Sequence, residues 1–402
     1  MKKYEGLRVL YVGSHPLFTE GASAVHMLKM CQAMTNLGIE VECVLPGRVN
    51  KKRLFSYYGI KNPFRVTSIA LSGGLARRPL HGFLSSLYAC GKKEEFDLVL
   101  TRDLVFAWFA TKVFGVPTVY DAHHPPVNWA AERIIASFSR SKSLLGMSFN
   151  SRGLHDIYFC LGMTGQNPIV APNGFEREAF EGEHDISSLR ERLGLPLKRK
   201  IVCYCGNTYR GRGLEILARA AAQMPEVEFL IVGGRKRDNA LWREMARQEG
   251  SANLRIEGFV RQREVPSYLL ASDVLVMPYS SKVTIRDGTE AGKFTSPLKL
   301  FEYMAAGKPI VATGVPSVLE ILRPGENSVV TPPDDAEAFI RALGLVLADS
   351  ELCARISEDA RAGATEYTWE KRVERIIGMA GVMSSCRRSI DAREPNGATS
   401  QL

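Results

Sequence analysis

The 402-residue sequence lacks a long apolar run and any cysteine pair at a zinc-ligand spacing. No run approaches the roughly 20 apolar residues that a helix needs to span a bilayer. The eight cysteines are scattered, and the closest pair, Cys203 and Cys205, alternates along one expected strand, which is typical of core thiols. Residues 1–13 pass directly into a short strand-like run, without the apolar region and cleavage site of a signal peptide. These absences predict a soluble protein of the cytoplasm.

Motifs of several enzyme and binding classes are also missing. The sequence has no GxSxG elbow, Walker loop or Cys/His nucleophile pattern, which argues against hydrolases and ATPases. The glycine-containing loop at 13–23 is not GxGxxG, so a dinucleotide is poorly supported and we expect no cofactor. There is no DxD triplet, and we expect no essential metal. Aromatic residues do not interleave with the basic clusters, which argues against nucleic acid as a partner.

Charge of one sign is in excess, because the chain carries a formal net charge of +9. A positive field attracts nucleic acid, anionic lipid and phosphorylated substrates alike, so charge alone does not choose among them. The basic residues could form a peripheral contact with the inner face of a membrane, or an ordinary solvated face. They cluster in the first half of the chain, at Lys51, Lys52, Arg53, Arg77, Arg78, Lys92, Lys93, Arg133, Arg140 and Lys142.

The chain is long enough for two domains, and it contains two successive runs of alternating strands and helices. This pattern predicts an α/β protein with two Rossmann-like domains, each with a parallel sheet covered by helices. We expect the first domain at 1–180 and the second at 181–367, joined by a polar linker near 176–200. An apolar stripe predicts a last helix at about 368–383, which should pack back on the first domain. The polar, aperiodic segment 384–402 is expected to be a disordered tail.

The segment 295–313, TSPLKLFEYMAAGKPIVAT, predicts a helix that begins at an anion site. Ser296 is a good N-cap and Pro297 a good first helical residue, whereas Gly307 and a following proline end the helix before a buried strand. Free amides and the helix dipole favour an anion at this start. Lys299 lies in the first turn, where a cation is ordinarily disfavoured, and a bound diphosphate would explain it.

Glu302 lies on the same helix and is flanked by apolar residues. A buried carboxylate needs hydrogen-bond donors. A ribose diol would supply them, and so would a structural arginine elsewhere in the chain. Sequence reasoning leaves both alternatives open.

Two glycine-containing loops precede helices. The loop that begins at Gly206 brings Arg210 and Arg212 to a helix start, which suits neutralisation of a diphosphate, although both arginines could simply be solvated. In the first domain, Gly21 would let the backbone approach a phosphate or sugar closely, or it could be a flexible turn.

A third group of candidates lies at the carboxyl end of the strand expected at 117–121, where ligands gather in open α/β sheets. It comprises Asp121, His123 and His124. A histidine that faces the cleft could orient a sugar hydroxyl or a developing charge, whereas a buried one is often only hydrogen-bonded structure. We favour His123 over His124 for the functional role.

Several motifs, in this order, resemble those of family-four retaining glycosyltransferases, which have the GT-B fold of two Rossmann-like domains facing a central cleft. The resemblance covers nearly the whole chain. It is carried by EGASAVHMLKMCQAMTNLGIEV, VYDAHHPP, IVAPNGFE, YCGNTYRGRGLEIL, FLIVGG, GFVRQREVPSYLLASDVLVMPY, TSPLKLFEYMAAGKPIVAT and YTWEKR.

The resemblance implies a donor site for a nucleoside diphosphate sugar. Glu302 would hold the ribose, amides near Ser296 and Leu298 would meet the diphosphate, and Arg212 would neutralise it. His123 matches the histidine near the transferred sugar, and the run at 258–260 would lie against the base. Helped by Lys299, these residues would transfer the sugar, with retention, to a hydroxyl acceptor such as a glycan or a lipid-linked cell-surface precursor. Gly21 matches the glycine-rich loop on the family's acceptor side, and we count it among the donor-binding candidates together with Gly206, Asn207 and Arg210.

The sequence departs from the family pattern at two positions. Phe294 stands where the family has the first of two glutamates, so a carboxylate contact to the donor sugar is missing unless Glu290 or Asp287 replaces it. Asn207 replaces a second basic residue in the glycine loop. Two alternatives therefore stay open: a nucleotide-sugar epimerase of the same fold, and a catalytically weak subunit that binds the donor.

Overall fold

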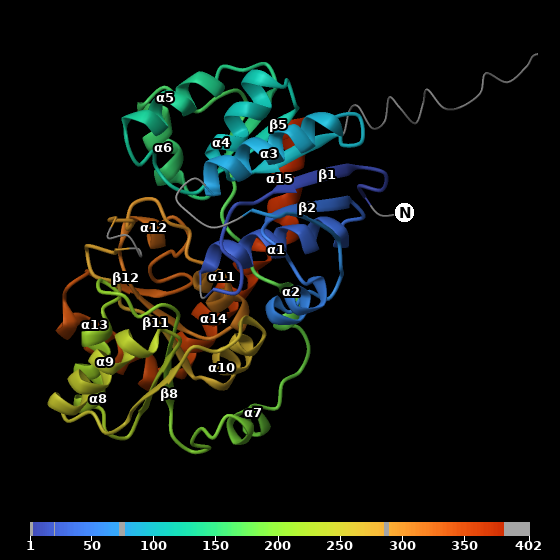
Figure 1. Cartoon of the computed structure of the whole chain (residues 1–402). Helices are drawn as coiled ribbons and strands as arrows, with labels where there is room; N and C mark the ends of the chain where they lie inside the picture. The colour runs from blue at the N-terminus through green and yellow to red at the C-terminus, as the bar shows by residue number, and fades with distance from the viewer. Residues whose placement is uncertain (1–2, 20, 72–76, 285–288, 382–402) are drawn as a thin grey trace, which may run out of the picture.

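The structure is a computed structural model that describes residues 3–19, 21–71, 77–284 and 289–381 (Figure 1). It contains two α/β domains, each with one parallel sheet, as the sequence predicts. The expected tail at 384–402 and Asp287 lie outside the described residues. Within the described ranges, no helix combines the length and the apolar character that crossing a bilayer requires.

The first sheet has seven parallel strands in the order β3-β2-β1-β4-β5-β6-β7. Its central strands are continuous apolar runs because helices cover both faces of the sheet. In β1, for example, four of the five residues are buried. The strands are β1 (Arg8–Val12), β2 (Glu40–Pro46), β3 (Arg65–Ile69), β4 (Leu98–Thr101), β5 (Thr118–Ala122), β6 (Leu144–Phe149) and β7 (Pro168–Val170).

The second sheet has six parallel strands in the order β10-β9-β8-β11-β12-β13. Its middle strand β8 is buried at all five positions, as expected for the centre of a doubly covered sheet. The strands are β8 (Ile201–Cys205), β9 (Glu228–Val232), β10 (Leu254–Gly258), β11 (Val274–Met277), β12 (Ile310–Thr313) and β13 (Val329–Thr331).

Helices connect the strands in both domains. In the first domain they are α1 (Ala22–Asn36), α2 (Lys51–Tyr58), α3 (Arg77–Gly91), α4 (Leu104–Trp108), the π-helical turn η1 (Phe109–Val113), α5 (Trp129–Phe138) and α6 (Arg152–Cys160). The remaining helices are η2 (Arg177–Ala179), α7 (Ile186–Arg192), α8 (Leu214–Gln223), α9 (Lys236–Gln248), η3 (Gln262–Glu264), α10 (Val265–Ala271), α11 (Leu298–Ala306), α12 (Pro316–Leu319), α13 (Ala336–Ala348), α14 (Ser350–Ala364), η4 (Thr365–Tyr367) and α15 (Trp369–Ala380).

The last helix, α15, returns to the first domain, where Figure 1 shows it in red among the blue elements. It packs against α1, β6 and β7. Its apolar stripe, which includes Trp369 and Val373, is buried in the core of the first domain. Phe175, just after the first sheet, pairs with Thr368 at the start of this helix, so the two chain crossings between the domains lie side by side.

A second contact joins the domains on the side of α6. The Glu320 carboxylate, directly after α12, accepts hydrogen bonds from the backbone amides of Arg152 and Gly153 at 2.7 and 2.8 Å. Free amides at a helix start favour such an anion. Phe294, from the second domain, is 4% exposed and belongs to an apolar cluster built mainly by the first domain. Its carbonyl accepts a hydrogen bond from the Ser151 hydroxyl at 2.7 Å.

Candidate functional site

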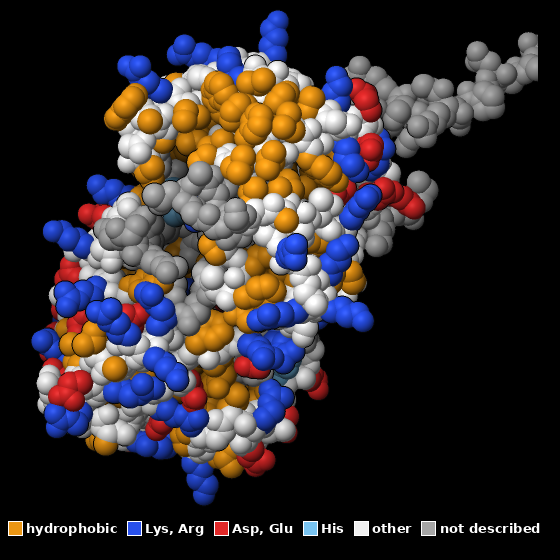
Figure 2. Space-filling model, viewed as in Figure 1, with side chains coloured by type: hydrophobic (Ala, Val, Ile, Leu, Met, Phe, Trp, Pro, Cys, Tyr) orange, Lys and Arg blue, Asp and Glu red, His pale blue; other side chains and the backbone are white. Residues whose placement is uncertain are grey.

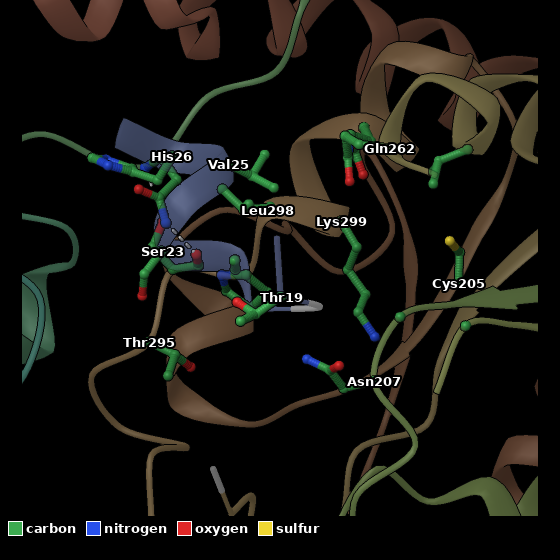
Figure 3. Close-up of a pocket in the computed structure, with 18 of the residues that line it drawn as sticks. Thr19, Ser23, Val25, His26, Cys205, Asn207, Gln262, Thr295, Leu298 and Lys299 are labelled. Carbon is green, nitrogen blue, oxygen red and sulfur yellow. Dashed lines mark hydrogen bonds between the residues drawn. The ribbon is translucent and has the colours of Figure 1, made fainter. Parts of the chain in front are cut away.

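A cavity of about 330 Å³ lies where the carboxyl ends of the two sheets face each other. Residues that line it come within three positions of the ends of eight strands, which is where ligands bind in open α/β sheets. Figure 3 shows side chains of both domains around this cavity, with α1 on one side and α11 on the other. The lining residues after strand ends are Arg102, His123, Asn150, Asn173, Gly206, Gly233, Phe259 and Tyr279, and the β1 loop adds Thr19.

The start of α11 differs by one residue from the sequence prediction. The helix begins at Leu298, and Pro297 occupies the N-cap position, where it makes no side-chain cap. Ser296 does not cap the helix, because its hydroxyl accepts a hydrogen bond from the Asn173 amide across the domain junction, at 3.0 Å. The first-turn amides therefore have no side-chain cap, and Ser296 and Leu298 both line the cavity. The end at Gly307 is as predicted, with φ at 60°.

Lys299 extends from this first turn toward Asn207, as Figure 3 shows. Its amine lies 3.8 Å from the ring centre of Tyr204 and 5.1 Å from that of Tyr279. The amine nitrogen is buried and meets no hydrogen-bond acceptor in the part of the chain that the structure describes. Burial lowers the pKa of Lys299 from its usual value. Aromatic rings and no hydrogen-bond acceptor among the described residues thus surround this buried cation, an arrangement that favours an anionic ligand.

Gly206 makes this approach of Lys299 possible. Its φ is 148°, and a Cβ added there would lie 2.5 Å from the Lys299 amine nitrogen. Any side chain at this position would therefore displace the amine. Asn207 follows it and also lines the cavity.

Arg212 also lies against Tyr279, with its guanidinium carbon 4.8 Å from the ring centre. It is 8% exposed and donates to the Thr284 carbonyl at 3.3 Å, while its Nε is buried without a partner among the described residues. Gly213 allows this placement, because a Cβ there would lie 1.5 Å from the Pro278 carbonyl oxygen. Lys299 and Arg212 therefore bring two cations to one ring beside the start of α11.

Glu302 also lines the cavity, one turn further along α11. The Gln262 side-chain amide donates a hydrogen bond to its carboxylate, so the partner is neutral and not a structural arginine. Burial raises the pKa of Glu302 to about 7, and the Gln262 hydrogen bond partly opposes the shift. Spare acceptor capacity on this carboxylate suits hydroxyl donors.

Two of the predicted donor-side residues do not line the cavity. Arg210 is exposed, and its carbonyl accepts a hydrogen bond from the Thr284 hydroxyl. Gly21 is exposed at the N-cap of α1, directly before Ala22, which does line the cavity. Glu290, the described candidate for the missing carboxylate, is exposed and outside the cavity.

His123 and His124 both line the cavity, and His123 joins a buried network. Its Nε2 lies 2.9 Å from Asp121 Oδ2. The ring centre of His26, from α1, lies 4.5 Å from that of His123. Burial, and then Arg102, lower the pKa of His123 to about 3, so the imidazole is neutral at physiological pH.

The side chains of His26, Asp121 and His123 are close enough to be considered as metal ligands, since their ligand atoms lie within 4.8 Å of one another. The charged groups around these three side chains disfavour a metal ion. Asp121 is ion-paired with Arg372 at 2.6 Å, and Arg102 lies 3.4 Å from His26 Nδ1. A divalent ion would have to compete with two buried guanidinium groups.

Sequence reasoning missed Tyr204, Tyr279, Gln262 and Arg372 as parts of the site. Tyr204 and Tyr279 belong to apolar strand segments and read as core residues. Gln262 and Arg372 lie within the quoted motifs GFVRQREVPSYLLASDVLVMPY and YTWEKR, but the resemblance assigned neither residue a role. Tyr279 offers the one usable signal, because it follows a strand end at the edge of the sheet where ligands bind.

Comparison with known proteins agrees with this geometry. Residues 185–363 match the family described as glycosyl transferases group 1. A protein from Xylanimonas cellulosilytica named D-inositol 3-phosphate glycosyltransferase is 26% identical over 87% of this chain and 89% of its own length. Residues 185–363 thus form a group 1 glycosyltransferase domain.

Other relatives of this glycosyltransferase match over different lengths. A D-inositol 3-phosphate glycosyltransferase from Corynebacterium urealyticum is 27% identical, but the match spans 52% of this chain and about half of that relative, 49%. The phosphatidyl-myo-inositol mannosyltransferase of Mycolicibacterium smegmatis is 24% identical over 94% of this chain and 95% of its own.

The fold of this glycosyltransferase is GT-B, as the sequence predicts. Its structure is similar to that of Anabaena HepE in complex with UDP-glucose, with a TM-score of 0.73 and 19% identity. The similarity covers 94% of this chain and all of that one.

Proposed function

We propose that this glycosyltransferase takes its sugar from a nucleoside diphosphate sugar and transfers it to a hydroxyl acceptor with retention at the anomeric carbon. The observation that carries the proposal is the buried Lys299 amine, which has no acceptor among the described residues and lies near Arg212 and the uncapped start of α11. A diphosphate would satisfy all three groups at once.

The main role that we propose for this site is to stabilise the negative charge of the leaving group. As the bond between the anomeric carbon and the diphosphate oxygen breaks, negative charge grows on the diphosphate beside Lys299 and Arg212. Electrostatic stabilisation in a site that excludes water accelerates such a step. Because these cations and the α11 amides supply the positive charge, we propose that no divalent ion is required.

Retention follows from attack on the face that the diphosphate leaves. The acceptor oxygen bonds to the anomeric carbon there, and its proton passes to the departing diphosphate. A covalent intermediate would need a carboxylate nucleophile. Among the described candidates, Glu302 is hydrogen-bonded to Gln262 and Glu290 lies outside the cavity, so neither is placed for that role.

The donor-binding claim is tested by thermal shift with UDP, GDP and ADP and their sugars. A ligand that binds only the native state raises its stability by mass action, by about 2.7 kcal/mol at one hundred times the dissociation constant. We expect one nucleoside diphosphate to stabilise the protein and its sugar to be consumed when an acceptor is present. No shift with any of them would contradict the proposal.

Product analysis separates the two alternatives. An epimerase would release a changed nucleotide sugar without an acceptor. A donor-binding subunit, which the replacement at Phe294 keeps under consideration, would bind the nucleotide and show no turnover with any acceptor.

The pH dependence of donor binding follows from Glu302, whose folded pKa is raised to about 7 from 4.5 in the unfolded chain. The folded state holds this proton more tightly, so the group's contribution to stability is present below pH 4.5 and is lost as pH rises through 7. Ribose hydroxyls bind the ionised form best, so we expect donor affinity to rise with pH through 7, with proton release on binding. Calorimetry in buffers of different ionisation enthalpy measures this release.

Glu302→Gln is the matched variant, because it keeps the shape and cannot titrate. It should remove the proton release and weaken the donor by about 1.5 to 3 kcal/mol, the value of a charged hydrogen bond. An unchanged affinity and unchanged proton release in this variant would exclude Glu302 from the ribose site.

The acceptor side of the proposal concerns the membrane. We propose that a cytoplasmic form of this enzyme contacts an anionic lipid surface through the helices α3, α4, η1 and α5, which pack on one another. Figure 2 shows hydrophobic side chains gathered on this upper domain, with basic residues around them. Val127, just before α5, and Trp129, its first residue, are 78% and 70% exposed. The basic residues Lys112 of η1 and Arg133 of α5 are also exposed. One relative is named for phosphatidyl-myo-inositol, which fits a lipid-linked acceptor.

Removal of these apolar side chains tests the membrane contact. Val127→Ser with Trp129→Ser should lower binding to phosphatidylglycerol vesicles at least about tenfold, because each buried side chain contributes about 1.5 to 3 kcal/mol. The control is Leu345→Ser, which removes an exposed apolar side chain from the second domain. If the unaltered protein fails to float with anionic vesicles at low salt, the proposed surface is wrong.

A further inference from the structure

We propose that Arg372, on the last helix of the chain, is a positioning residue that holds the His123 imidazole in the cleft through Asp121. The inference rests on the proposed function, because His123 has a role to be positioned for only if sugar transfer takes place in this cavity. Arg372 itself does not line the cavity. It therefore acts through the groups that it contacts.

Asp121 is the centre of the arrangement, and its side chain is fully buried. Its Oδ1 accepts from Ser148 Oγ at 2.7 Å and from Arg372 Nη2 at 2.6 Å, and its Oδ2 lies 2.9 Å from His123 Nε2. An ionised carboxylate only accepts hydrogen bonds, so the ring proton of neutral His123 is on Nε2. This leaves Nδ1 as an acceptor, 3.3 Å from Asn150 Nδ2.

Arg372 ties this group to the junction of the two domains. It is 2% exposed, and its second terminal nitrogen, Nη1, donates to the Pro172 carbonyl at 3.1 Å. One rigid guanidinium thus fixes the end of β5 relative to the segment that leads out of the first domain. The apolar neighbours Trp369 and Val373 hold the helix in place.

The charges around the imidazole keep it neutral. Besides Asp121 and Arg372, it faces Arg102, His26 and His15. Burial raises the pKa of Asp121, but Arg372 and then His123 outweigh this and hold it well below its usual value. The ionised carboxylate in turn fixes one tautomer of His123, and the guanidinium offsets the stabilisation that this carboxylate would give to a protonated ring.

A purely structural ion pair is the competing explanation. Replacing a buried ion pair by uncharged groups of similar size is often neutral for stability, whereas removing one partner costs about 3 to 5 kcal/mol. A structural pair and a positioning pair therefore differ when both charges are removed together. The first predicts normal turnover in such a variant, and the second predicts that turnover stays low.

The experiment compares Arg372→Met with the double variant Asp121→Asn, Arg372→Met, by thermal unfolding and by kinetics with the nucleotide sugar. Arg372→Met should unfold at a lower temperature, and the double variant should regain most of that loss. We expect the double variant to keep a kcat at least about tenfold below normal with the donor KM within about twofold, since the proposed donor groups belong to the second domain. Arg375→Met is the control, because this half-buried arginine of the same helix pairs with Glu366.

Two further readouts separate positioning from stability. In Arg372→Met the unpaired Asp121 should raise the His123 pKa, so that kcat falls off at a higher pH than in the unaltered enzyme. Arg372→Lys keeps the charge and one of the two hydrogen bonds, and it should recover part of the kcat.

A double variant with normal kcat and a normal pH profile would overturn the inference. The proposed function fails in a different way: the unaltered enzyme then transfers no sugar, or His123→Ala turns over at the normal rate. If Arg372→Met does not fold, the double variant alone decides between the two outcomes.

Discussion

Replacing Lys299 by Met should nearly abolish sugar transfer while making the free protein more stable. The side chain places a buried amine beside Tyr204 and Tyr279 without an acceptor among the described residues. In the proposed mechanism this amine meets the growing charge of the diphosphate in the transition state. Loss of one such donor typically lowers kcat by about 10² to 10³.

Stability should move in the opposite direction. A buried charge without a partner costs free energy in the free enzyme, and Met fills the same space without charge. The folded pKa of Lys299 is lowered, so the cost is present at neutral pH and is relieved as pH rises. The exposed Lys198→Met is the matched control and should change neither property. A Lys299→Met enzyme with normal turnover would exclude this amine from catalysis.

Replacing Phe294 by Glu should damage the enzyme, although it restores the residue type that the family resemblance places there. Phe294 does not line the cavity; it is buried in a cluster with Ala122, Phe149 and Leu154 of the first domain. An ionised carboxylate in this cluster would lack a partner and should cost about 3 to 5 kcal/mol. We expect a lower unfolding temperature and lower activity.

Phe294→Leu is the control for this prediction, because it keeps an apolar side chain and should cost less than about 1.5 kcal/mol. Thermal unfolding and initial rates measure both variants. If Phe294→Glu were as stable as the unaltered protein and more active, the side chain would have to face the donor sugar.

Much of the fold could be predicted from the sequence because its central strands are continuous apolar runs. Strands such as β1 and β8 carry that signal. The edge strand β3 was missed because only one of its five residues is buried, so its sequence RVTSI shows no apolar run.

The part of the site that lies on one short segment of sequence could be predicted from that segment. The start of α11 holds Lys299 and Glu302 in consecutive turns, and both line the cavity. Ser296 was wrongly predicted as the cap because its hydroxyl is used by Asn173, a residue 123 positions away. Arg372 was missed for the same reason, since it meets Asp121 across 251 positions of sequence. Contacts of this kind are created by the return of the last helix and leave no local pattern.

The most direct test of the central claim is a crystal structure of the enzyme with the nucleoside diphosphate that stabilises it most. The account predicts phosphate oxygens within hydrogen-bonding distance of the first-turn amides of α11 and of the Lys299 amine, with Arg212 beside them. A diphosphate bound away from this helix start, with the Lys299 amine still unpaired, would contradict it.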